Sequence, residues 1–81
     1  MAKEIKQIPV ADQAEAFAVI NGLSRQYNMK QDTSRHQLQV ANDRYAAYYD
    51  IDEGVVKLEA IHPGITEEEI REFLISFPPF F

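Results

Sequence analysis

Residues 35–61, RHQLQVANDRYAAYYDIDEGVVKLEAI, decide the fold, because their apolar positions alternate as expected for three consecutive antiparallel strands. Asn42-Asp43 separates two alternating runs and is a candidate for the two-residue loop of a hairpin. That loop pairs Val40 with Tyr45 and places the apolar side chains of both strands on one face of the sheet. We therefore predict a hairpin in this register.

A second loop, at Glu53-Gly54, joins the second and third predicted strands. It pairs Ile51 with Val56 and again directs apolar side chains to the same face. A shift of one residue would turn Lys57 into the core, so the pattern strongly selects this face. A three-residue loop over residues 52–54 with a β-bulge is the competing interpretation.

The segment before the meander contains one predicted helix. Residues 1–11 form either an N-terminal arm or an edge strand, since Pro9 is compatible with a strand only at the edge of a sheet. Asp12 and Glu15 have the spacing of a capping box and begin a helix over residues 12–28. Residues 29–34 then form a polar connection. The helix face expected to lie on the sheet consists of Ala16, Val19, Ile20, Leu23 and Tyr27.

The second predicted helix covers residues 66–77. Thr66 is its N-cap and Glu69 completes a capping box, while the acidic first turn complements the helix dipole. Two prolines end the helix, and residues 78–81 form an aromatic tail. The apolar stripe of this helix consists of Ile70, Phe73, Leu74 and Phe77.

The order of elements is helix, three antiparallel strands, helix, with an N-terminal edge strand as an option. We therefore predict an α+β fold, a two-layer sandwich in which a three-stranded antiparallel meander carries both helices on one face. The 81 residues form a single domain over residues 1–81, because this length has room for one two-layer core. The 46 % apolar and 26 % charged residues are ordinary values for a globular protein.

Cysteine usage and hydropathy predict where the protein resides. The absence of cysteine excludes a disulfide scaffold and fits a reducing cytosol. No apolar run is long enough to span a bilayer, and the first residues lack the apolar core of a signal peptide. We expect a cytoplasmic protein with no membrane partner.

The net charge of −5 is unevenly distributed. Residues 1–49 carry six Lys and Arg against five Asp and Glu, whereas residues 50–81 carry two against eight. The third strand and the last helix are therefore acidic, which disfavours them as nucleic-acid contacts and favours a basic protein partner.

No residue pattern indicates an enzyme, a metal site or a cofactor site. His36 and His62 lack metal-ligand spacing; His36 is expected on the core face, and His62 is expected in a turn before Pro63-Gly64. The serines lack the context of a nucleophile elbow, and the glycines form no phosphate-binding loop. The Glu67 to Glu69 run is explained by its role in helix capping. We expect a non-enzymatic protein without a metal or cofactor.

The order of helix, three strands and helix resembles that of the double-stranded-RNA-binding domain. In that family the second helix begins with a lysine-rich motif that contacts phosphates. This chain has Thr66 to Glu69 there, and its carboxylates would repel phosphates, so the RNA-binding function does not carry over. The remaining nucleic-acid alternative is the outward sheet face, where Arg35, Tyr48 and Lys57 accompany Asp50.

The preferred hypothesis is a protein–protein interaction module, either an adaptor or an inhibitor of a basic surface. Apolar groups not needed by the core also suit a homodimer, as does the stripe of small residues at 14, 18 and 22 on the first helix. The aromatic tail either contacts a partner or folds back on its own core. The predicted partner-binding residues are an acidic ridge of Asp52, Glu53, Glu67, Glu68 and Glu72, together with Ile75, Phe80 and Phe81.

Overall fold

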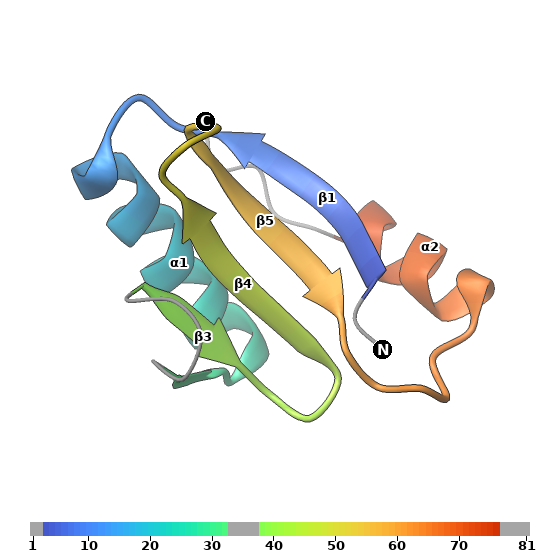
Figure 1. The fold of residues 1–81 in the computed structure, drawn as a ribbon. Coiled ribbons are helices and arrows are strands. Elements are labelled where there is room, and N and C mark those ends of the chain that lie inside the picture. The colour runs from blue at the N-terminus through green and yellow to red at the C-terminus, as the bar shows by residue number, and fades with distance from the viewer. Residues whose placement is uncertain (1–2, 33–37, 77–81) are drawn as a thin grey trace.

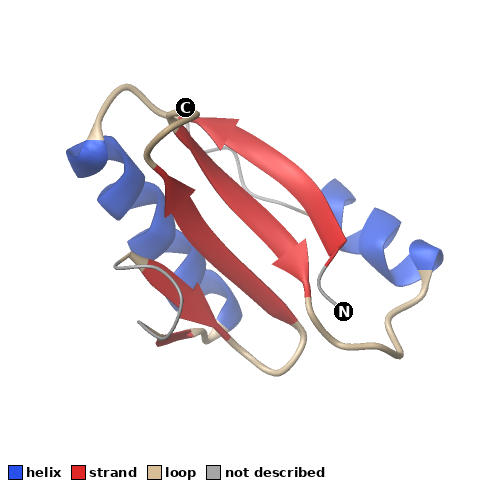
Figure 2. Cartoon of the chain, in the orientation of Figure 1, coloured by secondary structure: helices blue, strands red, loops and turns tan. Residues whose placement is uncertain are grey.

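The computed structural model describes residues 3–32 and 38–76, which form one five-stranded antiparallel sheet and two helices (Figure 1, Figure 2). This confirms the predicted α+β class. The elements are β1 (Lys3–Pro9), α1 (Gln13–Tyr27), β2 (Lys30–Gln31), β3 (Gln39–Ala41), β4 (Tyr45–Asp50), β5 (Val55–Ala60) and α2 (Glu67–Ile75).

The spatial order of the strands is β1-β5-β4-β3-β2. The chain begins at one edge of the sheet, and α1 carries it to the opposite edge. The strands β2 to β5 then return as a meander until β5 pairs with β1. Both helices lie behind the sheet in Figure 1, so they cover one face and leave the other face, called here the outer face, without a helix.

The structure resolves the open alternative for the N-terminus in favour of a strand. β1 pairs with β5 from Lys3 to Pro9, and Pro9 lies at the edge as its missing N–H requires. An irregularity in register between Glu4 and Lys6 interrupts the pairing, a feature that protects exposed edges. The short strand β2 was not predicted, because residues 30–31 lie in a segment interpreted as a connection.

The β3–β4 hairpin has the predicted faces in a different register. Val40 pairs with Ala47, so the prediction that it pairs with Tyr45 is wrong by two residues. The Asn42 side chain explains the shift, because its Oδ1 accepts hydrogen bonds from the backbone N–H groups of Arg44 and Tyr45 at 2.8 and 2.7 Å. The loop therefore begins one residue later than predicted. An offset of two residues leaves every side chain on its predicted face.

The β4–β5 hairpin is shifted by two residues in the opposite direction, so that its turn begins earlier in the chain than predicted. Val56 pairs with Tyr49, and the predicted pairing with Ile51 is wrong. Residues 51–54 form a four-residue turn, longer than either loop expected from the sequence. Ile51 consequently lies on the surface with 73 % of its area exposed, which corrects its predicted place in the core.

The core lies between the inner sheet face and the helices. Four of the five residues predicted to face the sheet from α1 are buried, and Tyr27 is half-buried. Ile70 of α2 is buried, with Phe73 and Leu74 half-buried beside it, while Phe77 lies outside the described residues. The buried set comprises Ile8, Ala16, Val19, Ile20, Leu23, Met29, Val40, Tyr45, Ala47, Val56, Leu58, Ala60 and Ile70.

Both predicted N-caps are confirmed. Asp12 accepts a hydrogen bond from the backbone N–H of Glu15 at 2.9 Å, and Thr66 accepts one from that of Glu69 at 3.2 Å. The Glu69 carboxylate, however, binds Arg44 Nη1 at 2.9 Å, so it is engaged in an ion pair with the β3–β4 turn. α2 ends at Ile75, two residues before the predicted end.

Candidate protein-binding surface

The structure separates the predicted acidic ridge into two groups. Asp52 and Glu53 lie in the turn that precedes β5, whereas Glu67, Glu68 and Glu72 lie in α2, which follows it. These groups are at opposite ends of β5 (Figure 1), so they do not form one continuous ridge. Ile75 is 79 % exposed on α2, and Phe80 and Phe81 lie outside the described residues.

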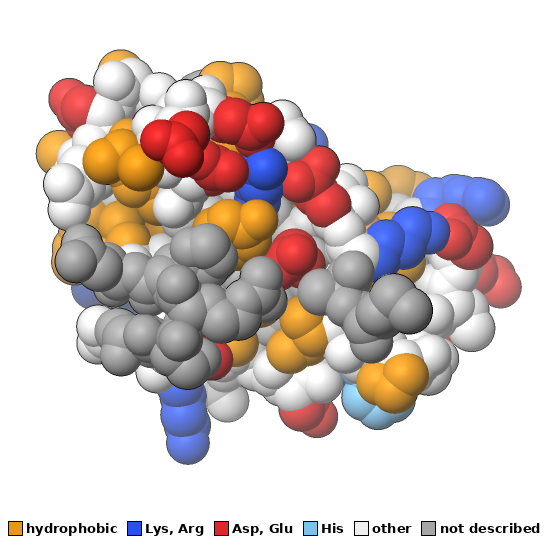
Figure 3. Space-filling view, viewed as in Figure 1, with side chains coloured by type: hydrophobic (Ala, Val, Ile, Leu, Met, Phe, Trp, Pro, Cys, Tyr) orange, Lys and Arg blue, Asp and Glu red, His pale blue; other side chains and the backbone are white. Residues whose placement is uncertain are grey.

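Glu53 of the first group belongs to a set of charged side chains on the outer face, the Lys57 cluster, which consists of Lys57, Glu4, Asp50 and Glu53. Lys57 Nζ lies 2.7 Å from Glu53 Oε2, 3.2 Å from Asp50 Oδ2 and 3.7 Å from Glu4 Oε1. These carboxylates come from β1, β4 and the β4–β5 turn, so strand pairing assembles the cluster. Figure 3 shows acidic side chains gathered around a basic one on this face.

The cluster stabilises the charged forms of two of its members. Hydrogen bonds to the carboxylates of Glu53 and Asp50 hold the pKa of the Lys57 ammonium well above its usual range. Hydrogen bonds from the backbone N–H of Glu53 and from Lys57 hold the pKa of the Asp50 carboxyl below its usual value of 3.8. With formal charges, three carboxylates against one ammonium leave an excess of two negative charges.

The turn beside the cluster is held by several backbone contacts. Asp50 Oδ1 accepts hydrogen bonds from the backbone N–H groups of Asp52 and Glu53, at 3.0 and 3.2 Å. Gly54 has a φ of +68°, a conformation that favours glycine, and its carbonyl accepts a hydrogen bond from the Val10 N–H at 3.1 Å. The turn is thus fixed both internally and to the chain before α1.

This turn presents one apolar side chain between acidic groups. Ile51 is 73 % exposed, and the two residues that follow it, Asp52 and Glu53, are also exposed. Residues 51–53 together with the Lys57 cluster are called here the acidic tip. Sequence reasoning identified Asp52 and Glu53 but assigned Ile51 to the core and did not anticipate Glu4, whose position depends on the pairing of β1 with β5.

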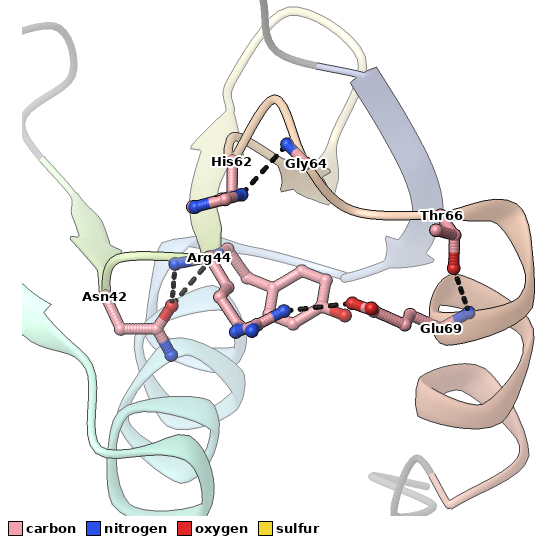
Figure 4. Close-up of polar contacts among 7 residues, drawn as sticks. Asn42, Arg44, His62, Gly64, Thr66 and Glu69 are labelled. Atoms are coloured by element: carbon pink, nitrogen blue, oxygen red, sulfur yellow. Dashed lines mark hydrogen bonds and ion pairs between the residues drawn. The ribbon is translucent and has the colours of Figure 1, made fainter.

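Two carboxylates at the opposite end of the sheet, those of Glu67 and Glu69, each pair with one basic side chain. Lys3 forms an ion pair with Glu67, which lowers the pKa of that carboxyl. Figure 4 shows Arg44 directed toward Glu69, and the ion pair joins the β3–β4 turn to the first turn of α2. Phe73 packs nearby, with its ring centroid 4.1 Å from that of Tyr45. These contacts fasten α2 to the sheet.

His62 has the turn role that the sequence indicated. Its Nδ1 accepts a hydrogen bond from the Gly64 backbone N–H at 2.9 Å (Figure 4). A Cβ atom at position 64 would lie 3.0 Å from the His62 ring, so glycine permits this close approach. His36 and Arg35 lie outside the described residues.

The outer face does not favour nucleic-acid binding. Lys57, the basic residue proposed for phosphate contact, is surrounded by carboxylates, and its side chain is 15 % exposed. Burial raises the pKa of the neighbouring Tyr48, and the charge of Glu59 raises it further. An aromatic group beside carboxylates is a poor stacking surface for a polyanion.

Within residues 3–32 and 38–76, no group of three or more His, Cys, Asp or Glu side chains is arranged to hold a metal ion. Neither α1 nor α2 has the length and apolar composition needed to cross a bilayer. Comparisons with protein-family models, curated proteins and solved structures found no match to this chain.

Proposed function

We propose that the protein is a non-enzymatic interaction module that binds a basic protein surface through the acidic tip. The observation that carries the proposal is the exposed Ile51 between carboxylates on a turn held by Asp50 and Gly54. Binding energy in protein interfaces concentrates in a few apolar anchors surrounded by polar groups. A turn that is already ordered also loses less conformational entropy when it binds.

The charge of the acidic tip indicates the chemistry of the partner. Asp52 adds a further carboxylate to the excess of the Lys57 cluster, so the tip attracts Lys and Arg side chains. We infer a partner with an apolar pocket for Ile51 bordered by basic residues. Such a module acts as an adaptor, or as an inhibitor that covers a basic surface. We place this role in the cytoplasm, in keeping with a chain that contains no cysteine.

The proposal is tested by affinity capture from the native cell, followed by titration calorimetry with the captured partner after purification. The tip variant is D52K/E53K, and the matched control is E68K/E72K, which makes the same charge change on exposed residues of α2. We expect the control to retain the partner and the tip variant to lose it. The single variant I51S should weaken binding by tenfold or more, about 1.4 kcal/mol.

Equal affinity of wild type and D52K/E53K for the partner would show that the tip is not the contact surface. Circular dichroism spectra of all variants establish that the fold is retained. Because opposite charges around the Ile51 anchor contribute to binding, affinity for the purified partner should also decrease as salt increases.

A further inference from the structure

A hollow of about 210 Å³ lies between α1 and the β2–β3 side of the sheet. Its α1 wall consists of Phe17, Ile20, Asn21 and Ser24, and the strand side adds Gln31, Leu38, Gln39 and Val40. Its walls therefore combine four apolar side chains with four that can form hydrogen bonds. A dry apolar cavity of about 150 Å³ holds a benzene molecule, so this hollow has room for an aromatic ring.

Phe17 combines with the hollow to make a self-complementary surface. Its side chain is 57 % exposed although it lines the hollow, so the ring is available to a second molecule. The protruding ring and the hollow lie on the same flank of α1. A twofold axis perpendicular to a helix keeps corresponding flanks of the two copies on the same side. One ring can thus reach the hollow of the other copy.

We propose that two copies of this chain associate through α1, antiparallel and about such a twofold axis, with each Phe17 in the hollow of the other copy. The remaining contact surface of α1 has small side chains, because Ala14 and Ala18 are exposed and Gly22 is half-buried. In this arrangement Ala18 of one copy faces Gly22 of the other, so the helix backbones approach closely. That contact gives a reason for a glycine in the middle of α1.

Charge complementarity along α1 favours this antiparallel arrangement. The first turn of the helix is acidic, with Glu15, and its last turn is basic, with Arg25. Among the described residues, neither of these two side chains forms an ion pair within its own chain. Antiparallel pairing centred on Ile20 places Glu15 of each copy opposite Arg25 of the other. A parallel arrangement would place like charges together.

The size of the surface sets the strength of the association. α1 has 15 residues and is therefore about 22 Å long. One face of such a helix is smaller than the roughly 800 Å² per partner of a standard interface. We expect a reversible dimer that forms in the high micromolar range. Because α1 begins next to the β4–β5 turn, the dimer would present its two acidic tips at opposite ends of the helix pair.

Sedimentation equilibrium from micromolar to millimolar concentration tests the proposal by charge exchange. E15R alone and R25E alone each place like charges opposite one another and should both remain monomeric. Their equimolar mixture restores two attractive pairs and should form a heterodimer, and the double variant E15R/R25E should dimerise like wild type. The variant F17S should be monomeric throughout, whereas I75S, a change at a similarly exposed apolar residue on α2, should dimerise normally.

Three results would overturn the proposal. One is a wild-type chain that stays monomeric at millimolar concentration. The second is a dimer that is lost in I75S and kept in F17S. The third is a mixture of E15R and R25E with no heterodimer. Since none of these outcomes involves the acidic tip, failure here is separate from failure of the proposed binding of a basic partner.

Discussion

The two ends of the sheet contain similar numbers of carboxylates and use them differently. At the end near α2, Glu67 and Glu69 pair singly with Lys3 and Arg44. At the acidic tip, three carboxylates share Lys57, and an exposed isoleucine lies beside them. Acidic composition alone therefore does not locate a binding surface. The proposed binding surface rests instead on an excess of negative charge beside the exposed Ile51.

The largest effect is expected from Phe73→Ala, which tests whether the α2 end is structural. The ring packs 4.1 Å from the centroid of Tyr45 and 4.7 Å from that of Tyr27. Removing this half-buried ring should lower the free energy of unfolding by about 2–3 kcal/mol. Urea denaturation measures the change. Ile75→Ala on the exposed side of α2 should change it by less than about 0.5 kcal/mol.

A smaller loss is expected from Gly54→Ala at the acidic tip. A φ of +68° is strained for alanine, so the free energy of unfolding should decrease by about 1 kcal/mol. Gly64→Ala at the other end is the matched change. It meets only the His62 ring, which can rotate away, and should cost about 0.5 kcal/mol. A larger loss at position 64 than at 54 would contradict the rigidity assigned to the tip. Thermal unfolding compares the two variants.

The two ends of the sheet should contribute differently to the loss of stability at low pH, with the larger contribution from Asp50 at the acidic tip. The folded-state pKa of the Asp50 carboxyl lies below the usual value of 3.8. Between the folded-state and unfolded-state pKa values, the unfolded chain therefore binds more protons than the folded chain. The stabilisation is complete above pH 3.8 and is lost as the pH falls through the folded-state pKa. D50N should flatten this part of the curve of urea midpoint against pH.

E67Q is the comparison for that pH experiment. The pKa of Glu67 is also lowered, by Lys3, but this side chain is 76 % exposed whereas that of Asp50 is 23 % exposed. Solvent screens exposed pairs, so E67Q should flatten the curve less than D50N. Equal curves for D50N and wild type would remove Asp50 as the source of the acid dependence.

The smallest effect is expected from breaking the Arg44–Glu69 ion pair. Both side chains are about half exposed, and exposed ion pairs contribute little to stability. A double-mutant cycle with R44A and E69Q should give a coupling energy of about 0.5 kcal/mol. A coupling above about 1.5 kcal/mol would contradict the small contribution expected of an exposed ion pair.

The predicted secondary structure depended mainly on local signals, and most of it is confirmed. Asp12 and Thr66 cap their helices as predicted, because a cap requires only residues close in sequence. The two-residue periodicity also predicted the faces of the strands correctly. Both registers were wrong by two residues, since side chains of Asn42 and Asp50 bind turn N–H groups and relocate the loops. Hydrophobic alternation does not distinguish registers that differ by an even number.

The candidate surface was only partly predictable. Asp52 and Glu53 were identified from charge. They were grouped with the acidic residues of α2, but β5 separates them from that helix. Glu4 joins the surface because β1 pairs with β5, a contact between residues more than fifty positions apart. Ile51 reaches the surface because the four-residue turn removes it from β4.

By itself, the sequence determined the helices, their caps and the side of the sheet that each residue faces, since these follow from propensity and periodicity over a few residues. The tertiary structure decided the strand order, the pairing registers and the separation of the acidic residues into two groups. These depend on which distant segments pair and on how turn side chains satisfy the backbone. Charge and periodicity along the chain contain neither kind of information.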